Sequence, residues 1–446
     1  MIALGGDAYL IASRWWSRAF FHHDRRADES GDATEPLPSS FRRRTLPPTK
    51  AIRQAPRGAA IMESMSLFKN SRSALLYLLP ALAAALAVAA CEDDSSSPGV
   101  PSVHGYFAFT TTTDFQTGSS SIVTADDSVL TAFKDVATLH SDAFVRSFGG
   151  YIYVLNRQGA DNIQVMDPLD GFRTRRQFTT GNGSDPADIV FQNSSRAYVT
   201  RYNEDQMWIV NPNSGQRTGQ IDFSWLADAD LVPEMAHMVK VSNRVFVAIQ
   251  RVDGNLDPTG ISYVAVFDAL TEQFIDAEPT TAGRQAIKLT GTNPFGELVY
   301  NSFSGQVWVP EAGFFGARDG GLELINPVTL AKSGIVISEN TLGGDVTDVV
   351  ALDANRGAAI VTDSNSNTLL VGFDLATPAT IDTIYAPGSF ALRDAERSRD
   401  GRIFVSDRSL ALPGIRVFRG SDHTQITINP IDVGLPPADI EFVLTN

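Results

Sequence analysis

One strand-like motif returns seven times along the chain and constrains its fold more than any other feature. In each copy a large apolar or aromatic residue precedes a small apolar one, within a short run bounded by turn residues. The copies begin at Phe107, Tyr153, Tyr198, Phe246, Trp308, Ile360 and Phe404, at intervals of 46, 45, 48, 62, 52 and 44 residues. After residue 102 no apolar pattern of helical period and length interrupts this series.

A second apolar run follows each copy and often ends on Asp or Asn before Pro, as in Val165-Met166-Asp167-Pro168. A repeat of this length, made of short strands and turns, is typical of a propeller blade. The sequence therefore predicts an all-β fold over residues 103–446: a seven-bladed β-propeller of four-stranded antiparallel blades.

The two ends of the repeat region supply complementary pieces of one blade. Residues 186–191, which open the third unit as its innermost strand, have nearly the same sequence as residues 437–442 near the chain end. The first unit lacks such a strand. We expect residues 437–445 to supply it, because an open ring would expose unpaired strand edges.

Two of the motif copies also resemble a known repeat. Tyr153-Val154-Leu155-Asn156 and Tyr198-Val199-Thr200-Arg201 are similar to the signature of YVTN-type propeller repeats. The resemblance covers residues 103–446, although its other copies are degenerate. It implies the same seven-bladed fold as the period does.

The first ninety residues differ in composition from the rest. They hold 12 Lys and Arg against 7 Asp and Glu, whereas residues 91–446 hold 24 against 44. A basic stretch, 65–73, precedes an apolar run, 74–90, which is the order of a secretory signal peptide. The run ends in Val88-Ala89-Ala90-Cys91, which resembles the lipobox of bacterial lipoproteins. A transmembrane anchor and a free buried cysteine are the alternatives.

The lipobox resemblance implies that Cys91 is lipidated and becomes the mature N-terminus. We expect a signal peptide at 62–90 and a flexible polar tether at 91–102. Residues 1–61 are expected to be a basic disordered segment, and a gene prediction that starts too far upstream would explain why it precedes an export signal. The protein would then be exported and attached to a membrane through a lipid on Cys91. The outer membrane is favoured, with the inner membrane and the cell surface as alternatives.

Composition and motifs also exclude several functions. The net charge of -15 argues against binding nucleic-acid phosphates, and one cysteine cannot form an internal disulfide or a thiolate zinc site. The chain contains no nucleophile elbow, zinc-protease helix motif or phosphate-binding loop. No catalytic residue is predicted, and an enzyme is less favoured than a binding protein.

The predicted strand order places the loops from blade to blade, and those from the second to the third strand of each blade, on one face. These loops are long and unlike one another, as binding loops on a rigid scaffold are. Aromatic and arginine side chains anchor many interfaces, so this face is the candidate partner-binding surface. Its candidate residues are Phe115, Arg157, Arg201, Trp225, Phe314, Phe315, Arg318 and Arg408. The alternative is that the aromatic residues pack the loops themselves.

A second candidate set comes from aligning the innermost strands. Near-equivalent positions at the channel mouth hold Asp188, His237, Glu297, Asp348 and Asp439. Carboxylates gathered there would attract Ca²⁺, another divalent cation or a cationic ligand. The alternative is that each carboxylate accepts backbone N–H groups between blades.

These observations predict a monomeric cell-envelope lipoprotein whose propeller presents a loop-rich face to an envelope protein or a small ligand. The alternative is a periplasmic propeller enzyme of the lyase, lactonase or quinoprotein-like kind, with a metal or carboxylate site at the channel mouth. Because propellers serve many functions, that alternative rests on fold analogy.

Overall fold

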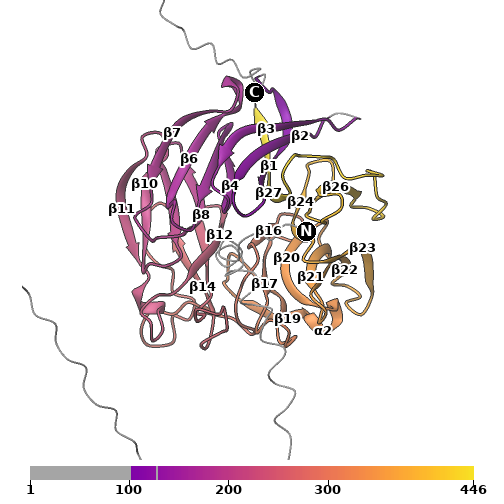
Figure 1. Ribbon diagram of the computed structural model, residues 1–446. Coiled ribbons are helices and arrows are strands. Elements are labelled where there is room, and N and C mark those ends of the chain that lie inside the picture. Colours follow the sequence, from indigo (N-terminus) through magenta and orange to yellow (C-terminus); the bar gives the residue numbers. More distant parts are fainter. Residues whose placement is uncertain (1–101, 127–128, 446) are drawn as a thin grey trace, which may run out of the picture. The chain divides into compact units, whose positions relative to one another are not determined.

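Seven antiparallel β-sheets surround a common axis in the computed structural model, which describes residues 102–126 and 129–445 (Figure 1). The predicted seven-bladed β-propeller is confirmed. The predicted signal peptide, Cys91 and all but the last residue of the tether lie outside the described residues. Within the described ranges, no helix is both long and apolar enough to cross a membrane.

Blades 1 to 4 each contain four strands, ordered from the innermost to the outermost. Blade 1 comprises β27 (Pro437–Thr445), β1 (Gly105–Thr113), β2 (Gly118–Thr124) and β3 (Ala132–Leu139). Blade 2 comprises β4 (Ala143–Phe148), β5 (Tyr151–Asn156), β6 (Asn162–Asp167) and β7 (Arg173–Thr179). Blade 3 comprises β8 (Pro186–Asn193), β9 (Arg196–Arg201), β10 (Gln206–Asn211) and β11 (Gln216–Asp222). Blade 4 comprises β12 (Met235–Val241), β13 (Arg244–Ile249), β14 (Tyr263–Asp268) and β15 (Ile287–Lys288).

Blades 5 to 7 complete the ring. Blade 5 comprises β16 (Val299–Asn301), β17 (Gln306–Glu311), β18 (Gly321–Ile325) and β19 (Lys332–Ser338), and blade 6 comprises β20 (Asp345–Ala351), β21 (Arg356–Thr362), β22 (Asn367–Asp374) and β23 (Ile381–Ser389). Blade 7 comprises β24 (Leu392–Arg397), β25 (Arg402–Asp407) and β26 (Gly414–Arg419), and single bridges to Gln425 and Ile431 hold its outer edge. The short helices are η2 (Pro168–Asp170), η3 (Ser224–Leu226) and α2 (Glu339–Leu342).

The C-terminal strand closes the ring as predicted. β27 pairs antiparallel with β1, from Gly105 opposite Thr445 to Thr112 opposite Pro437. The backbone N–H of Thr113 then donates to Pro436 at 2.9 Å. The first blade therefore takes its innermost strand from the far end of the chain.

The repeated two-residue motif is explained by packing between blades. The motif lies on the second strand of each blade, where both faces are covered by neighbouring blades. In blade 1, Phe107 packs in the cluster shared with blade 2, whereas Ala108 packs in the cluster shared with blade 7. Tyr153 and Val154 of blade 2 repeat this division toward blades 3 and 1. The period in the sequence therefore reflects the packing of each blade between its two neighbours.

Candidate functional site

Each blade presents one residue at the same level of the central channel, six of them from an innermost strand and one, in blade 5, from the segment just before β16. We call these seven residues the inner ring; in order from blade 1 to blade 7 they are Asp439, Phe144, Asp188, His237, Glu297, Asp348 and Asp394. A β-bulge interrupts the ladder at this level in blades 1, 3, 4, 6 and 7. Bulges re-aim side chains and are common beside functional sites. All five residues predicted for the channel mouth belong to the inner ring.

Each aspartate of the inner ring joins its blade to the next one. One carboxylate oxygen accepts a backbone N–H from the following innermost strand: Asp188 from Met238 at 2.8 Å, Asp348 from Ala395 at 2.9 Å, Asp394 from Ile440 at 2.6 Å and Asp439 from Val145 at 2.6 Å. For the three predicted aspartates, this is the backbone-accepting role that the sequence offered as the alternative to cation binding. The hydrogen bonds explain why Asp recurs in this register.

Arg146 divides the inner ring into two electrostatic settings. It lies on β4, two residues after Phe144, with its Nε 2.9 Å from Asp188 Oδ1 and its Nη2 2.9 Å from Glu297 Oε1. Burial opposes ionisation of Asp188, but Arg146 and then His237 hold the pKa of its carboxyl below 3.8. We call blades 2 to 5 the arginine-paired half.

Blades 6, 7 and 1 form the acid-rich half. Among the described residues, no Lys, Arg or His side-chain nitrogen forms an ion pair within 4.0 Å of a carboxylate oxygen of Asp348, Asp394 or Asp439. Burial, followed by repulsion from neighbouring carboxylates, raises the pKa of all three well above 3.8. Further along the channel, burial also raises the pKa of Glu441 to about 7. The folded protein therefore favours protons on this half.

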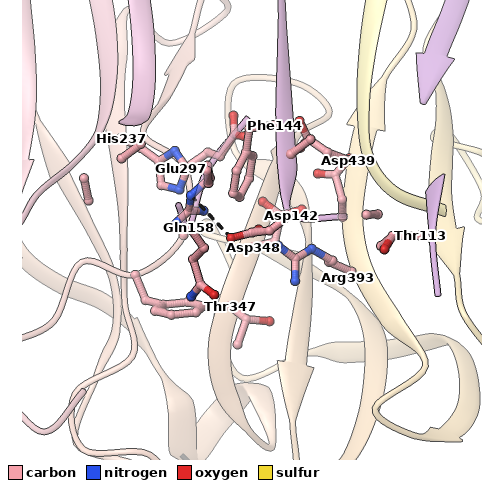
Figure 2. A pocket seen from close by; sticks show the side chains of 18 of the residues that line it. Thr113, Asp142, Phe144, Gln158, His237, Glu297, Thr347, Asp348, Arg393 and Asp439 are labelled. Carbon is pink, nitrogen blue, oxygen red and sulfur yellow. Dashed lines mark ion pairs between the residues drawn. The ribbon is translucent and has the colours of Figure 1, made fainter. Parts of the chain in front are cut away.

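A cavity of about 400 Å³ opens above the inner ring, and we call it the mouth cavity (Figure 2). Its walls come from the blade-to-blade loops and from the loops after the second strand of each blade, which is the face predicted to bind a partner. Among the residues predicted from the sequence, it is lined by His237, Glu297, Asp348, Asp439, Phe115, Arg157, Phe315 and Arg408. The two candidate sets therefore belong largely to one site.

The other predicted residues lie apart from this lining. Asp188 is fully buried beneath it. Arg201 is buried and donates to Thr180 O at 2.8 Å, and Trp225 packs edge-to-face on Phe274 at 5.3 Å. Both side chains therefore pack against neighbouring loops instead of lining the cavity, and for Trp225 this resembles the packing role that the alternative interpretation gave to the aromatic residues.

Phe314 and Arg318 also lie outside the cavity. Phe314 is 41% exposed, whereas Arg318 is half-buried and has a positive φ of 58°. Both come from the long loop between β17 and β18, whose neighbouring Phe315 does reach the cavity.

Sequence reasoning missed several lining residues, including Phe144, Phe295, Arg393 and Asp394. A signal for Asp394 was present. Residues 392–397 repeat the spacing of acids in residues 437–442, with Asp394 and Glu396 matching Asp439 and Glu441. The neighbouring Arg393 replaces the small residue found at that position in other blades, such as Ala438 and Ala187.

The carboxylates do not converge as metal ligands. Among residues 102–126 and 129–445, no group of three or more His, Cys, Asp or Glu side chains is placed to hold a metal ion. The inner-ring aspartates face separate blade junctions instead of one shared point, because each is oriented by its backbone donor.

Comparisons with known proteins support the fold. No family model and no curated protein matches the sequence. Among solved structures, a putative 6-phosphogluconolactonase from Bacteroides fragilis superposes with a TM-score of 0.56 at 11% identity, covering 76% of this chain and 98% of that chain. The periplasmic gluconolactonase of Pseudomonas aeruginosa gives 0.52 at 11% identity, covering 76% and 99%. A functionally unknown protein from Desulfotomaculum acetoxidans gives 0.52 at 11% identity, also covering 76% and 99%. At this identity the likeness establishes the propeller fold.

Proposed function

We propose that this protein is an exported envelope lipoprotein whose propeller binds a small polar molecule in the mouth cavity. The observation that carries the proposal is the convergence of charged inner-ring residues and loop residues on one concave site. Its volume of about 400 Å³ falls in the range of small-ligand pockets. Its lining combines aromatic side chains such as Phe144 and Phe295 with many polar and charged ones, which suits a polar ligand.

The membrane attachment in this proposal rests on the sequence around Cys91. The lipobox-like tetrapeptide and the polar tether that follows it would hold the propeller beside a membrane. Substituting Cys91→Ser tests the anchor. We expect the variant to leave the membrane fraction after a high-salt wash, and retention there would refute lipid anchoring.

A lactone-hydrolysing enzyme is the second candidate. It is favoured by His237, which lines the mouth cavity and has its Nδ1 3.8 Å from Asp188 Oδ2. A histidine held beside a carboxylate can act as a general base toward a bound water. Two of the solved propellers described above are named as gluconolactonases, which motivates a test with gluconolactone.

Equilibrium dialysis of the purified full-length protein against a mixture of small metabolites tests the binding proposal. Ala236, a buried residue of the cavity wall, offers a filling substitution. We expect the protein to retain a compound that Ala236→Phe releases, while Ser195→Phe, on an exposed turn between β8 and β9, retains it. If Ala236→Phe does not fold, Thr347→Leu, also on the cavity wall, is the second variant.

The proposal would be refuted if the wild-type protein retained no compound, or if Ala236→Phe and Thr347→Leu retained the compound as well as wild type does. The enzyme is tested in parallel by following gluconolactone opening at constant pH. Turnover that is lost in His237→Gln would favour the enzyme over the binding protein.

A further inference from the structure

We propose that the mouth cavity contains an anion subsite formed by Arg393 and Arg408, and that it holds the carboxylate or phosphate group of a small organic molecule. This inference rests on the proposed function, since it names the class of ligand for the same cavity. Neither residue takes part in the aspartate hydrogen bonds between blades or in the ion pairs of Arg146.

Arg393 is the second residue of β24 and lines the cavity directly beside the inner ring (Figure 2). Its side chain is half-buried, and no carboxylate of the described residues lies within 4.0 Å of it. The Phe144 ring covers its guanidinium at 5.6 Å. A guanidinium held in a concave site without an ion pair carries an unbalanced desolvation cost, which an anion would offset.

Arg408 approaches the same cavity from the loop after β25. It donates through Nη1 to Pro437 O at 3.0 Å and through Nη2 to Thr113 O at 3.2 Å, so its contacts are neutral carbonyls. The Phe115 ring lies 4.5 Å from its guanidinium carbon. Burial, together with the charge of Arg393, lowers the pKa of Arg408 to about 9. The two cations therefore repel each other across the site.

Of the three guanidiniums that line the cavity, one has ion-pair partners among the described residues. Arg157 is the third guanidinium, and it pairs with Asp185 at 3.2 Å and faces Asp142 at 4.0 Å. Asp142 is also the carboxylate with the largest influence on Arg393. Among the described residues, neither Arg393 nor Arg408 has a carboxylate oxygen within 4.0 Å of its guanidinium nitrogens, and burial raises the pKa of the nearby Asp348, Asp394 and Asp439. One added anion would complete this arrangement.

The chemistry of the anion follows from the guanidinium. Its planar set of N–H donors matches the oxygens of carboxylate and phosphate groups. Phe144 and Phe115 lie over the guanidiniums of Arg393 and Arg408, and a ring over the face leaves the N–H groups at the edge for oxygen acceptors; Arg408 uses two of its five for carbonyls. Phe295 and Phe315, in edge-to-face contact at 5.2 Å, add an apolar wall for the body of the molecule.

Three probes separate the sources of this chemistry: gluconate, which carries a carboxylate on a hydroxylated chain; inorganic phosphate; and glucose, which is neutral. Binding to the full-length protein is measured by isothermal titration calorimetry and by the rise in melting temperature. We expect gluconate or phosphate to bind and glucose to bind at least roughly tenfold more weakly. Arg393→Gln and Arg408→Gln should each weaken anion binding roughly 10- to 100-fold.

Arg397→Gln is the matched control. Arg397 ends the same strand, also lies over an aromatic ring (Phe303, at 5.0 Å), and lines a separate small pocket. It should leave anion binding unchanged. The melting temperature without ligand supplies a second readout, because loss of a repelled cation in Arg393→Gln should not lower it, whereas loss of a structural arginine would.

The outcomes distinguish this inference from the proposed function. If dialysis yields a neutral ligand, or if anions bind equally to Arg393→Gln, Arg408→Gln and wild type, the anion subsite is refuted while the binding cavity stands. If neither gluconate nor phosphate binds wild type at millimolar concentration, the subsite is also refuted. Selective binding of phosphate over gluconate would assign the site to phosphorylated ligands. Selective binding of gluconate over phosphate would assign it to carboxylates.

Discussion

The inner ring holds the same hydrogen bond in two different electrostatic settings. In the arginine-paired half, Asp188 accepts the N–H of the next blade and also an N–H of Arg146, 2.9 Å away. In the acid-rich half, Asp394 accepts the corresponding N–H at 2.6 Å, with no cation within 4.0 Å among the described residues. Both side chains are buried at equivalent positions of their strands.

The difference between the halves shows that position in the fold fixes the hydrogen bond but not the charge. The pKa of Asp188 is lowered although burial opposes it, because Arg146 lies against it. The pKa of Asp394 is raised, by burial and then by Asp439 and Asp348. The arginine-paired half therefore contains an ion-pair network, whereas the buried acids of the acid-rich half hold their protons more tightly than ordinary carboxyl groups do.

Removing the charge of Asp188 should have the largest effect on stability. Asp188→Asn keeps an oxygen for the Met238 N–H but removes one of the two carboxylates paired with Arg146 among the described residues, leaving Glu297. Breaking a buried ion pair costs about 3–5 kcal/mol of unfolding free energy. Urea unfolding followed by tryptophan fluorescence measures this loss. A decrease below about 1 kcal/mol would mean that the two halves do not differ.

The pH dependence of stability should separate the halves next. The pKa of Glu441 rises from 4.5 to about 7, through burial and despite Arg146, so the folded state binds its proton more tightly than the unfolded state does. The contribution of Glu441 to stability is then fully present below about pH 4.5 and falls as pH rises to about 7, by roughly 2–3 kcal/mol. Asp188 has the opposite sign, because its pKa is lowered and its contribution is lost as pH falls.

Glu441→Gln should flatten the decline between pH 4.5 and 7 in urea unfolding measured at a series of pH values. Asp422→Asn is the control, because the pKa of this exposed acid is lowered to about 2 and it titrates outside that window. A decline that persists unchanged in Glu441→Gln would assign it to other acids, such as Glu396, whose pKa is also raised by burial.

The fold could be predicted from the sequence because it is repetitive. Blade packing places a large residue toward one neighbour and a small one toward the other, so pairs such as Phe107-Ala108 recur with a readable period. Near-identical residues at 186–191 and 437–442 even located the closing strand. The same alignment placed five residues at the channel mouth.

The charge pattern of the site could not be predicted in this way. Arg146 reaches Asp188 on the next blade and Glu297 three blades away, a contact across the channel with no signature in sequence spacing. Arg201 has the same appearance in sequence as Arg408, but Arg201 donates to Thr180 O in the connection between blades 2 and 3, whereas Arg408 lines the cavity. Loop conformation decides between them, and each loop is different.

The smallest effect on stability is expected for Asp394→Asn, the counterpart of Asp188→Asn in the acid-rich half. Asp394→Asn retains an oxygen for the Ile440 N–H and replaces a carboxyl that favours its neutral form, so no cation loses a close partner. We expect a change in unfolding free energy within about 1 kcal/mol at pH 7, because a neutral hydrogen bond exchanged for a similar one costs little. Loss of several kcal/mol, equal to that of Asp188→Asn, would show that Asp394 is ionised and paired in solution. A stabilisation of the variant relative to wild type that grows as pH rises would instead support the raised pKa of Asp394, since the variant removes a carboxyl group whose folded state binds a proton more tightly than its unfolded state does.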